Sequence, residues 1–242
     1  MSEPLKPGQK GRGMLAEVFG AMPLPAAPMH FDPCYDDYWE ERIGGKMTNE
    51  PTLRRTRGVL PYIAAGDSVL DVGCGTGETL RLLVEARGIV GTGLDVSAHA
   101  LDQVAAMGFD ALRMDLADPH AELPGEFDHI LVFEVIEHVV DAETFLLKLK
   151  GRFRKGLYVT TPNLGYLSHR LRMLFGRFPI TYLMDPREHV RYWTTADFCH
   201  WLRWLGFPQP EVIGLCGRFW LFGLYRWWPS LWAFETLYRI TP

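Results

Sequence analysis

The stretch from Val69 to Gly77 reads VLDVGCGTG, and it decides the fold. An apolar run of strand length leads to an acidic residue and then to a glycine-rich loop, before a helical pattern begins at Glu78. Glycine is required where the backbone turns with a positive φ angle and where a ligand approaches closer than a Cβ atom permits. The stretch therefore predicts a strand, a ligand-binding loop and a helix whose free N–H groups attract an anion.

The residue that follows the glycine loop argues against a dinucleotide ligand. A dinucleotide-binding fingerprint places glycine where this chain has Glu78, and an acidic side chain repels a pyrophosphate. A zwitterionic amino-acid moiety fits better, because Asp71 can face its ammonium group while the start of the helix receives its carboxylate.

From Ser68 onward, apolar stretches of strand length alternate with helical patterns. This alternation predicts a doubly wound α/β fold, in which helices cover both faces of a mostly parallel sheet and ligands bind at the carboxyl ends of the strands. The predicted strands are Ser68–Val72, Ile89–Asp95, Ala111–Leu116, His129–Phe133, Leu157–Thr161 and Glu211–Cys216. The predicted helices are Glu78–Arg87, Ala98–Met107, Asp141–Phe153 and Thr195–Leu205.

Acidic residues lie at the ends of three successive predicted strands. Asp95 can accept hydrogen bonds from both hydroxyls of a ribose, and Asp115, with the Leu116 backbone beside it, can accept one from an adenine amino group. One aspartate at a strand end is ordinary turn chemistry. Three of them, counting Asp71, are hard to explain in that way when they come with a glycine loop.

VLDVGCGTG, GLDVS at Gly93–Ser97 and FDHILVFEVIEHV at Phe127–Val139 together resemble class I S-adenosylmethionine-dependent methyltransferases, over a match from Arg54 to Phe207. The resemblance implies a Rossmann-like sheet, S-adenosylmethionine as cofactor, the glycines around its methionine portion, Asp95 at the ribose and Asp115 near the adenine. It does not identify the substrate. The expected cofactor-binding residues are Asp71, Gly73, Gly75, Gly77, Asp95, Val96, Asp115, Leu116 and Phe133.

Glu134, Glu137 and His138 form an E-x-x-E-H group just past the fourth predicted strand, and His189 lies further along the chain. Residues three and four apart share one face of a helical turn, so these groups can converge. The ensemble resembles ubiquinone-pathway O-methyltransferases and plant small-RNA 2′-O-methyltransferases. That resemblance implies that two glutamates and two histidines hold a magnesium ion beside the acceptor hydroxyl.

Mixed carboxylate and imidazole ligands suit Mn²⁺ or another transition metal better than Mg²⁺. The alternative is a hydrogen-bonded or acid–base cluster that holds no metal. In either case His138 is the first candidate for a general base, because the ordinary pKa of histidine lies near neutrality. His189 and Glu134 are the further catalytic candidates.

Four segments are predicted along the chain. Residues 1–45 form a flexible arm with a short helix near Met14–Phe19 and a pinning or lid helix at Tyr35–Arg42, and residues 46–162 form the cofactor-binding core. Residues 163–193 form an inserted amphipathic cap, and residues 194–242 a closing helix and strand with an aromatic C-terminal segment.

The inserted cap and the aromatic segment at Phe219–Tyr238 favour an apolar acceptor. Leu167, Leu171, Leu174, Phe175 and Phe178 fall on one side of the predicted cap helix, and His169, Arg170, Arg172 and Arg177 fall largely on another. Both segments fit packing on the domain or on a partner, and both also fit contact with a membrane surface. The cap partially resembles methionine-biosynthesis W-type proteins, which leaves a regulatory role open.

We therefore expect methyl transfer to a hydroxyl of an apolar or lipid-linked small molecule, with a cofactor-binding regulatory subunit of a metabolic enzyme as the alternative. The net charge of −4 and the lack of a basic face disfavour nucleic acid as a partner. Scattered cysteines and the lack of a signal-peptide pattern favour the cytoplasm, with peripheral membrane contact and a homodimer both left open.

Overall fold

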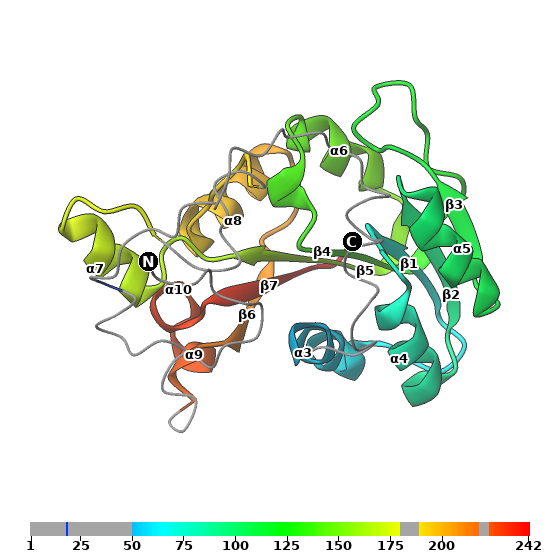
Figure 1. The fold of residues 1–242 in the computed structure, drawn as a ribbon, viewed down its shortest axis with the longest axis horizontal. Coiled ribbons are helices and arrows are strands. Elements are labelled where there is room, and N and C mark those ends of the chain that lie inside the picture. Colours follow the sequence, from blue (N-terminus) through cyan, green and yellow to red (C-terminus); the bar gives the residue numbers. More distant parts are fainter. Residues whose placement is uncertain (1–17, 19–49, 180–188, 218–222) are drawn as a thin grey trace, which may run out of the picture.

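In the computed structural model of the chain, the structure describes residue 18 and residues 50–179, 189–217 and 223–242 (Figure 1). The predicted N-terminal arm lies outside these residues, apart from Val18, and so does the helix expected at Tyr35–Arg42. The first part of the aromatic segment, residues 218–222, lies outside them as well. Within the described residues, no helix is both long and apolar enough to cross a bilayer.

A seven-stranded sheet lies at the centre of the described residues, with strand order β3-β2-β1-β4-β5-β7-β6. Its strands are β1 Ser68–Val72, β2 Val90–Asp95, β3 Asp110–Arg113, β4 Phe127–Phe133, β5 Phe153–Pro162, β6 Glu211–Cys216 and β7 Glu235–Ile240. The first five strands run parallel, whereas β7 is antiparallel to both of its neighbours. The predicted doubly wound, mostly parallel sheet is confirmed.

Helices cover both faces of this sheet (Figure 1). They are α3 Glu50–Val59, η1 Leu60–Tyr62, α4 Glu78–Arg87, α5 Ala98–Ala106, η2 Ile136–His138, α6 Ala142–Leu149, α7 Leu167–Leu174, α8 Thr195–Trp204, α9 Leu224–Trp227 and α10 Pro229–Trp232. α6 and α8 pack on one face and α3 and α4 on the other. Consecutive residues of β1 divide between the two layers, because Leu70 joins the first cluster and Val69 the second.

The strand order places a topological switch point at β1 and β4. From β1 the chain moves outward through β2 to β3, and it then returns to the other side of β1 as β4. In parallel sheets, ligands bind in the crevice that opens at the carboxyl ends of such strands. The glycine loop follows β1 and the E-x-x-E-H segment follows β4, so the topology brings both to this crevice.

The predicted helix boundaries hold where glycine sets them. α4 has its predicted bounds and lies between Gly77 and Gly88, which have φ angles of 78° and 62°. The helix predicted at Asp141–Phe153 was drawn too long. It ends at Leu149, because Gly151 turns the chain with φ 75° and β5 begins two residues later.

β7 was not predicted, because its sequence, ETLYRI, was assigned to the end of the aromatic segment. Glu235, Thr236, Leu237 and Tyr238 are all buried, because β7 lies inside the sheet between β5 and β6. Among the described residues, the C-terminal end of the chain is therefore part of the core.

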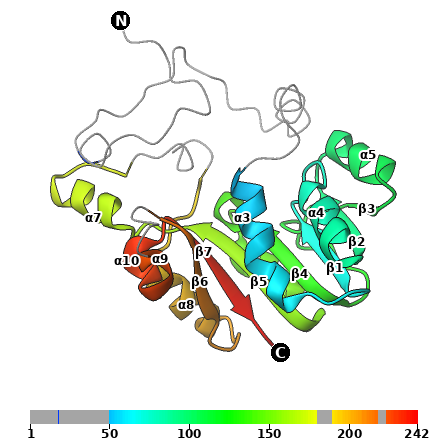
Figure 2. The same ribbon diagram turned by 90° about the horizontal axis from the view of Figure 1, so that it is seen from below.

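Helix α7 lies at one end of the molecule and packs through its polar side (Figures 1 and 2). Its buried residues are Ser168, His169 and Arg172, whereas Leu174 is 75% exposed and Phe175 is 55% exposed. α7 therefore packs through the side that carries His169 and Arg172, whereas Leu174 and Phe175 stay exposed. Arg172 is buried because it donates hydrogen bonds to the carbonyl oxygens of Val18 and Phe178.

Candidate functional site

The glycine loop between β1 and α4 turns through the left-handed region of backbone space. Gly73, Gly75 and Gly77 have φ angles of 69°, 50° and 78°, which side chains rarely allow. A Cβ atom built on Gly73 would lie 2.3 Å from Cγ2 of Val135, in the turn that follows β4. The loop therefore touches the segment that carries the E-x-x-E-H group.

Asp95, at the end of β2, holds this loop in place through hydrogen bonds. Its carboxylate oxygens accept hydrogen bonds from the backbone N–H groups of Gly75 and Ser97, both at 2.9 Å. The Leu94 carbonyl oxygen accepts two more from the first residues of the loop, Gly73 and Cys74, at 2.7 and 3.1 Å. Each carboxylate oxygen of Asp95 keeps a further lone pair, so hydrogen bonding to a ribose stays a prediction.

Asp71 lies inside β1, directly before the loop, and is only 3% exposed. Burial raises the pKa of its carboxyl group to about 8, and the negative charge of Asp95 adds to the shift. A positively charged group that enters the crevice would therefore stabilise the ionised form of Asp71.

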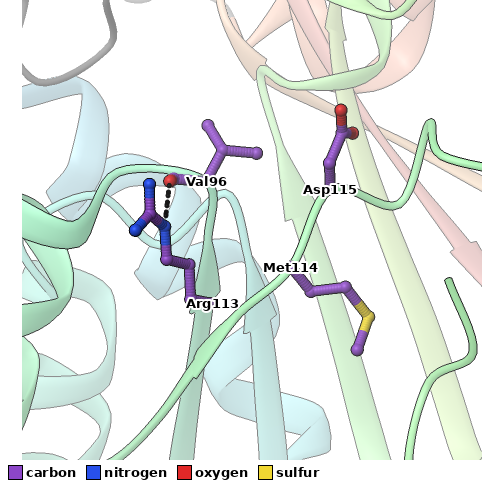
Figure 3. Close-up of a pocket in the computed structure, with 4 residues that line it drawn as sticks. All are labelled: Val96, Arg113, Met114 and Asp115. Carbon is purple, nitrogen blue, oxygen red and sulfur yellow. Dashed lines mark hydrogen bonds between the residues drawn. The ribbon is translucent and has the colours of Figure 1, made fainter.

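A cavity of about 490 Å³ opens at the ends of β2 and β3 (Figure 3). Val96, Arg113, Met114 and Asp115 line it. In Figure 3 the side chains of Val96 and Asp115 extend beyond the strand ends, while Arg113 donates a 3.2 Å hydrogen bond to the Val96 carbonyl oxygen. Two of the predicted cofactor-binding residues therefore border one cavity, together with two residues that the sequence did not indicate.

The other seven predicted cofactor-binding residues do not line this cavity, and two of them, Leu116 and Phe133, contribute to the core clusters. The Leu116 side chain is 2% exposed and packs in the core, and its carbonyl oxygen accepts a hydrogen bond from Lys148. Phe133, at the end of β4, packs against the core cluster on the opposite face. Their roles toward a cofactor rest on the sequence resemblance alone.

Glu137, His138 and His189 lie together in a second group, which we call the histidine wall. One possible ligand atom from each of the three residues lies within 4.8 Å of the others. The chain comes together here because the Glu137 carbonyl oxygen accepts hydrogen bonds from Val190 and Arg191 at 2.9 and 3.1 Å. The His138 and His189 rings then meet edge to face, with centroids 4.7 Å apart.

Hydrogen bonds to α6 also hold the segment that carries His189 in place. Arg191 donates hydrogen bonds to both carboxylate oxygens of Glu143, each at 2.7 Å. The Tyr192 hydroxyl donates to the His189 carbonyl oxygen at 3.0 Å. The two histidines therefore meet because hydrogen bonds from the residues after His189 to Glu137 and Glu143 hold the segment there, and their spacing in the sequence does not indicate these contacts.

Glu137 is 1% exposed, and neither of its carboxylate oxygens has a hydrogen-bond partner among the described residues. Burial raises its pKa well above the ordinary value, and the nearby charge of Glu134 raises it further. A buried carboxylate of this kind needs a proton or a cation. One carboxylate beside two imidazoles is a donor set that transition-metal ions accept, so the residues fit a divalent metal.

Glu134 does not join this group of three. It is the non-glycine residue among those described that has a positive φ, at 54°, and its side chain turns toward β5 and α3. Thr160 accepts a hydrogen bond from the Glu134 N–H and donates one to its carboxylate, both at 3.0 Å. Burial raises the pKa of Glu134 to about 7, although Arg55 acts in the opposite direction.

Arg55 was missed by the sequence analysis. It lies on α3, with Nη2 at 3.4 Å from the Glu134 carboxylate and Nε in a hydrogen bond to Glu235, a residue of β7 that is fully buried. The nearby glutamates raise its pKa, although burial alone would lower it. No motif indicated this cluster, because its partners come from three distant parts of the chain.

The comparisons with known proteins agree with this architecture. The family described as "Methyltransferase domain" matches residues 38–208. The ubiquinone biosynthesis O-methyltransferase of Dechloromonas aromatica (strain RCB) is 23% identical over 160 residues, which cover 62% of this chain and 68% of that protein. The enzyme of that name from Thiobacillus denitrificans (strain ATCC 25259 / T1) is 29% identical over 164 residues, with the same two shares.

Solved structures show the same fold at low sequence identity. A SAM-dependent methyltransferase from Archaeoglobus fulgidus has a TM-score of 0.59 and 18% identity, covering 86% of this chain and 100% of that chain. The magnesium protoporphyrin IX methyltransferase of Synechocystis PCC 6803 with bound SAH has a TM-score of 0.56 and 18% identity, covering 85% and 93%.

Proposed function

Because the chain belongs to the methyltransferase-domain family and is a class I S-adenosylmethionine-dependent methyltransferase, we propose that it methylates a hydroxyl group of an apolar acceptor. The relatives named as O-methyltransferases support the hydroxyl. The observation that carries the proposal is the contact of Gly73 with Val135, which sets the cofactor loop against the turn that carries Glu137 and His138.

We assign the cofactor to the crevice between the glycine loop and the cavity at β3. Its methionine portion lies along the loop, with its ammonium group near Asp71. The positive charge of this group stabilises the ionised form of the buried Asp71 carboxyl group. Its ribose lies at Asp95. Its adenine lies between Val96 and Asp115, whose exposed carboxylate accepts a hydrogen bond from the adenine amino group.

In this proposal the enzyme mainly aligns the reactants and removes one proton. The acceptor oxygen attacks the sulfonium methyl group in line, S-adenosylhomocysteine leaves, and the hydroxyl proton passes to the imidazole of His138. His138 is half-buried and touches His189, which orients its ring. Thr160 and Arg55 hold the carboxylate of Glu134 apart from the two histidines.

A divalent cation in the histidine wall is the alternative to proton transfer to His138, because an imidazole whose lone pair binds a metal cannot accept a proton. Glu137, His138 and His189 would hold it, and it would lower the pKa of an acceptor hydroxyl beside it. The two buried, unpartnered oxygens of Glu137 are the reason to include it. An ion of the Mn²⁺ type suits these donors better than Mg²⁺.

The apolar nature of the acceptor is supported by one end of the molecule. Met173, Leu174, Phe175 and Phe178, at the end of α7, and Trp227 and Trp228, at the end of α9, are all at least 42% exposed. Both groups lie at the same end in Figures 1 and 2, and Arg170 of α7 donates a hydrogen bond to Ser230 of α10. Exposed Arg177 adds positive charge there. We propose that this end contacts an anionic bilayer that contains the acceptor.

The reaction is tested with a matched pair of phenols, one that carries a polyprenyl tail in detergent and one that lacks it. Mass spectrometry should find the product, heavier by one CH₂ unit, preferentially from the tailed phenol. His138→Ala should lower kcat by roughly 100-fold, the lower range for loss of a general base. His120→Ala, which changes an exposed histidine, is the control. Binding of S-adenosylhomocysteine without turnover of either phenol would favour the regulatory alternative.

A further inference from the structure

The cluster beside the histidine wall contains more acidic than basic side chains. It includes the buried Glu137 and Glu235 and the partly buried Glu134, and Arg55 is the cation that forms ion pairs within this cluster among the described residues. Arg55 reaches two of these carboxylates, Glu134 and Glu235, and forms no ion pair with Glu137. Within the described part of the chain, no arginine or lysine therefore forms an ion pair with Glu137, the carboxyl group beside the two histidines.

Arg55 also comes from a part of the chain outside the sheet. It lies on α3, which crosses the face of the sheet opposite α6 and α8 (Figure 2). Its guanidinium group binds β7 through Glu235 and the turn after β4 through Glu134. Helix α3 thereby holds the one carboxylate of the E-x-x-E-H group that stays apart from His138 and His189.

The backbone of Glu134 shows that this arrangement is held in place by its neighbours. A glutamate with a φ of 54° persists only where its surroundings fix it. Thr160 binds both its N–H group and its carboxylate, and Arg55 binds the carboxylate from the other side. Loss of the guanidinium group would leave Thr160 as its remaining described hydrogen-bond partner.

We propose that Arg55 competes with a divalent cation for the carboxylate of Glu134. Its guanidinium group holds Glu134 away from Glu137, His138 and His189, and so weakens cation binding by the histidine wall. This inference rests on the cation site of the proposed function. It makes Arg55 a positioning residue that acts through Glu134 and does not itself touch the substrate. When a cation binds, Glu134 is the carboxylate that can exchange one positive partner for another.

The test measures Mn²⁺ binding to the full chain by titration calorimetry, without acceptor. Arg55→Gln should bind Mn²⁺ at least tenfold more tightly, because the interaction between two charges about 4 Å apart at an effective dielectric constant near 20 is larger than a tenfold change in affinity. Arg57→Gln removes the same charge from an exposed position of the same helix, and its affinity should stay within about twofold of the original. Arg55→Lys keeps the charge and should stay close to the original affinity.

The direction of the change separates this role from a structural one. If Arg55 only holds α3 in place, Arg55→Gln should loosen the wall and weaken Mn²⁺ binding. Weaker binding, or the same binding as in Arg57→Gln, overturns the proposal. Glu134→Gln gives an independent reading if Arg55→Gln does not fold: it should weaken Mn²⁺ binding, and an unchanged affinity overturns the proposal as well.

The proposed cation site is checked in the same experiment with His138→Ala. If the original chain binds no Mn²⁺, the cation site and this inference both fail, while methyl transfer is still judged by its product. If Mn²⁺ binds and His138→Ala abolishes binding, but Arg55→Gln does not tighten it, the role of Arg55 alone fails.

Discussion

Asp71 is a buried carboxyl group whose pKa of about 8 makes it largely protonated at neutral pH. The ammonium and sulfonium groups of the cofactor are positive, so they favour its ionised form, and binding should release a proton. S-adenosylhomocysteine and S-adenosylmethionine should both bind more tightly as pH rises from 6 to 8, by at most roughly tenfold per pH unit for one proton.

Calorimetry in buffers with different ionisation enthalpies would measure the released proton. Asp71→Asn cannot ionise, so in this variant the part of the pH dependence that comes from the protein should disappear. An unchanged pH profile in Asp71→Asn would contradict the proposed contact between Asp71 and the cofactor.

Gly75 has a φ of 50° at the centre of the cofactor loop. Gly75→Val adds a β-branched side chain in the left-handed region, which costs about 1–2 kcal/mol, and also places atoms where the ligand approaches. Affinity for S-adenosylhomocysteine should fall roughly tenfold or more. Gly125→Val is the matched control, because Gly125 has a φ of 74° and open space around its Cβ position. Equal affinities in the two variants would reject the loop assignment.

At the scale of single residues, the sequence indicated those whose chemistry lies in a local motif. Gly73 and Asp95 could be predicted because glycine and aspartate occupy fixed places after a strand. Arg55 and Glu235 could not, since they are 180 positions apart and meet only once β7 has joined the sheet. An ion pair between distant elements leaves no periodic pattern.

Among the elements, α7 is held by a histidine that must stay neutral. His169 is 1% exposed, its Nδ1 lies 3.1 Å from the Asn163 carbonyl oxygen, and burial lowers its pKa to about 4. The unfolded pKa is near 6.5, so the folded state binds fewer protons between pH 6.5 and 4, and stability is lost as pH falls through that range. The loss should be about 2 kcal/mol between pH 7 and pH 5.

Hydrogen exchange of the α7 amides at pH 7 and pH 5, corrected for intrinsic rates, would measure this loss. His169→Gln should flatten the pH dependence, because its side chain does not titrate. His120→Gln, at an exposed position, should leave it unchanged. Equal protection of the α7 amides at both pH values in the original chain would contradict this prediction, because it would show that protonation of His169 does not lower the stability of α7.

The elements themselves were largely readable from the sequence. α4 and β1 have their predicted bounds because glycines and an apolar run set them locally. The buried side of α7 could not be predicted from the sequence, because periodicity gives the apolar side of a helix but not which side packs on the protein. Arg172 faces inward because two carbonyl oxygens there need a donor.

The whole molecule has an apolar end, and contact of this end with lipid is testable. Vesicles with anionic lipid should bind the protein at low salt and release it as salt rises, because Arg170 and Arg177 supply an attraction that salt screens. Leu174→Ser combined with Phe175→Ser removes two exposed apolar side chains, and binding should fall roughly tenfold or more. Val90→Ser, at an exposed position of β2, is the control. Absence of binding at low salt, or full binding by the double variant, would contradict bilayer contact.

The place of β7 has a consequence for how the protein is made. β7 follows β5 and β6 in the sequence, yet it lies between them in the sheet. During synthesis on the ribosome, the edge of β5 that later pairs with β7 therefore stays unpaired, and β6 has no neighbouring strand until β7 has emerged. Open strand edges pair readily with other chains. The nascent chain is thus exposed to aggregation until this strand inserts, and a chaperone that shields the edge of β5 would raise the yield of folded protein.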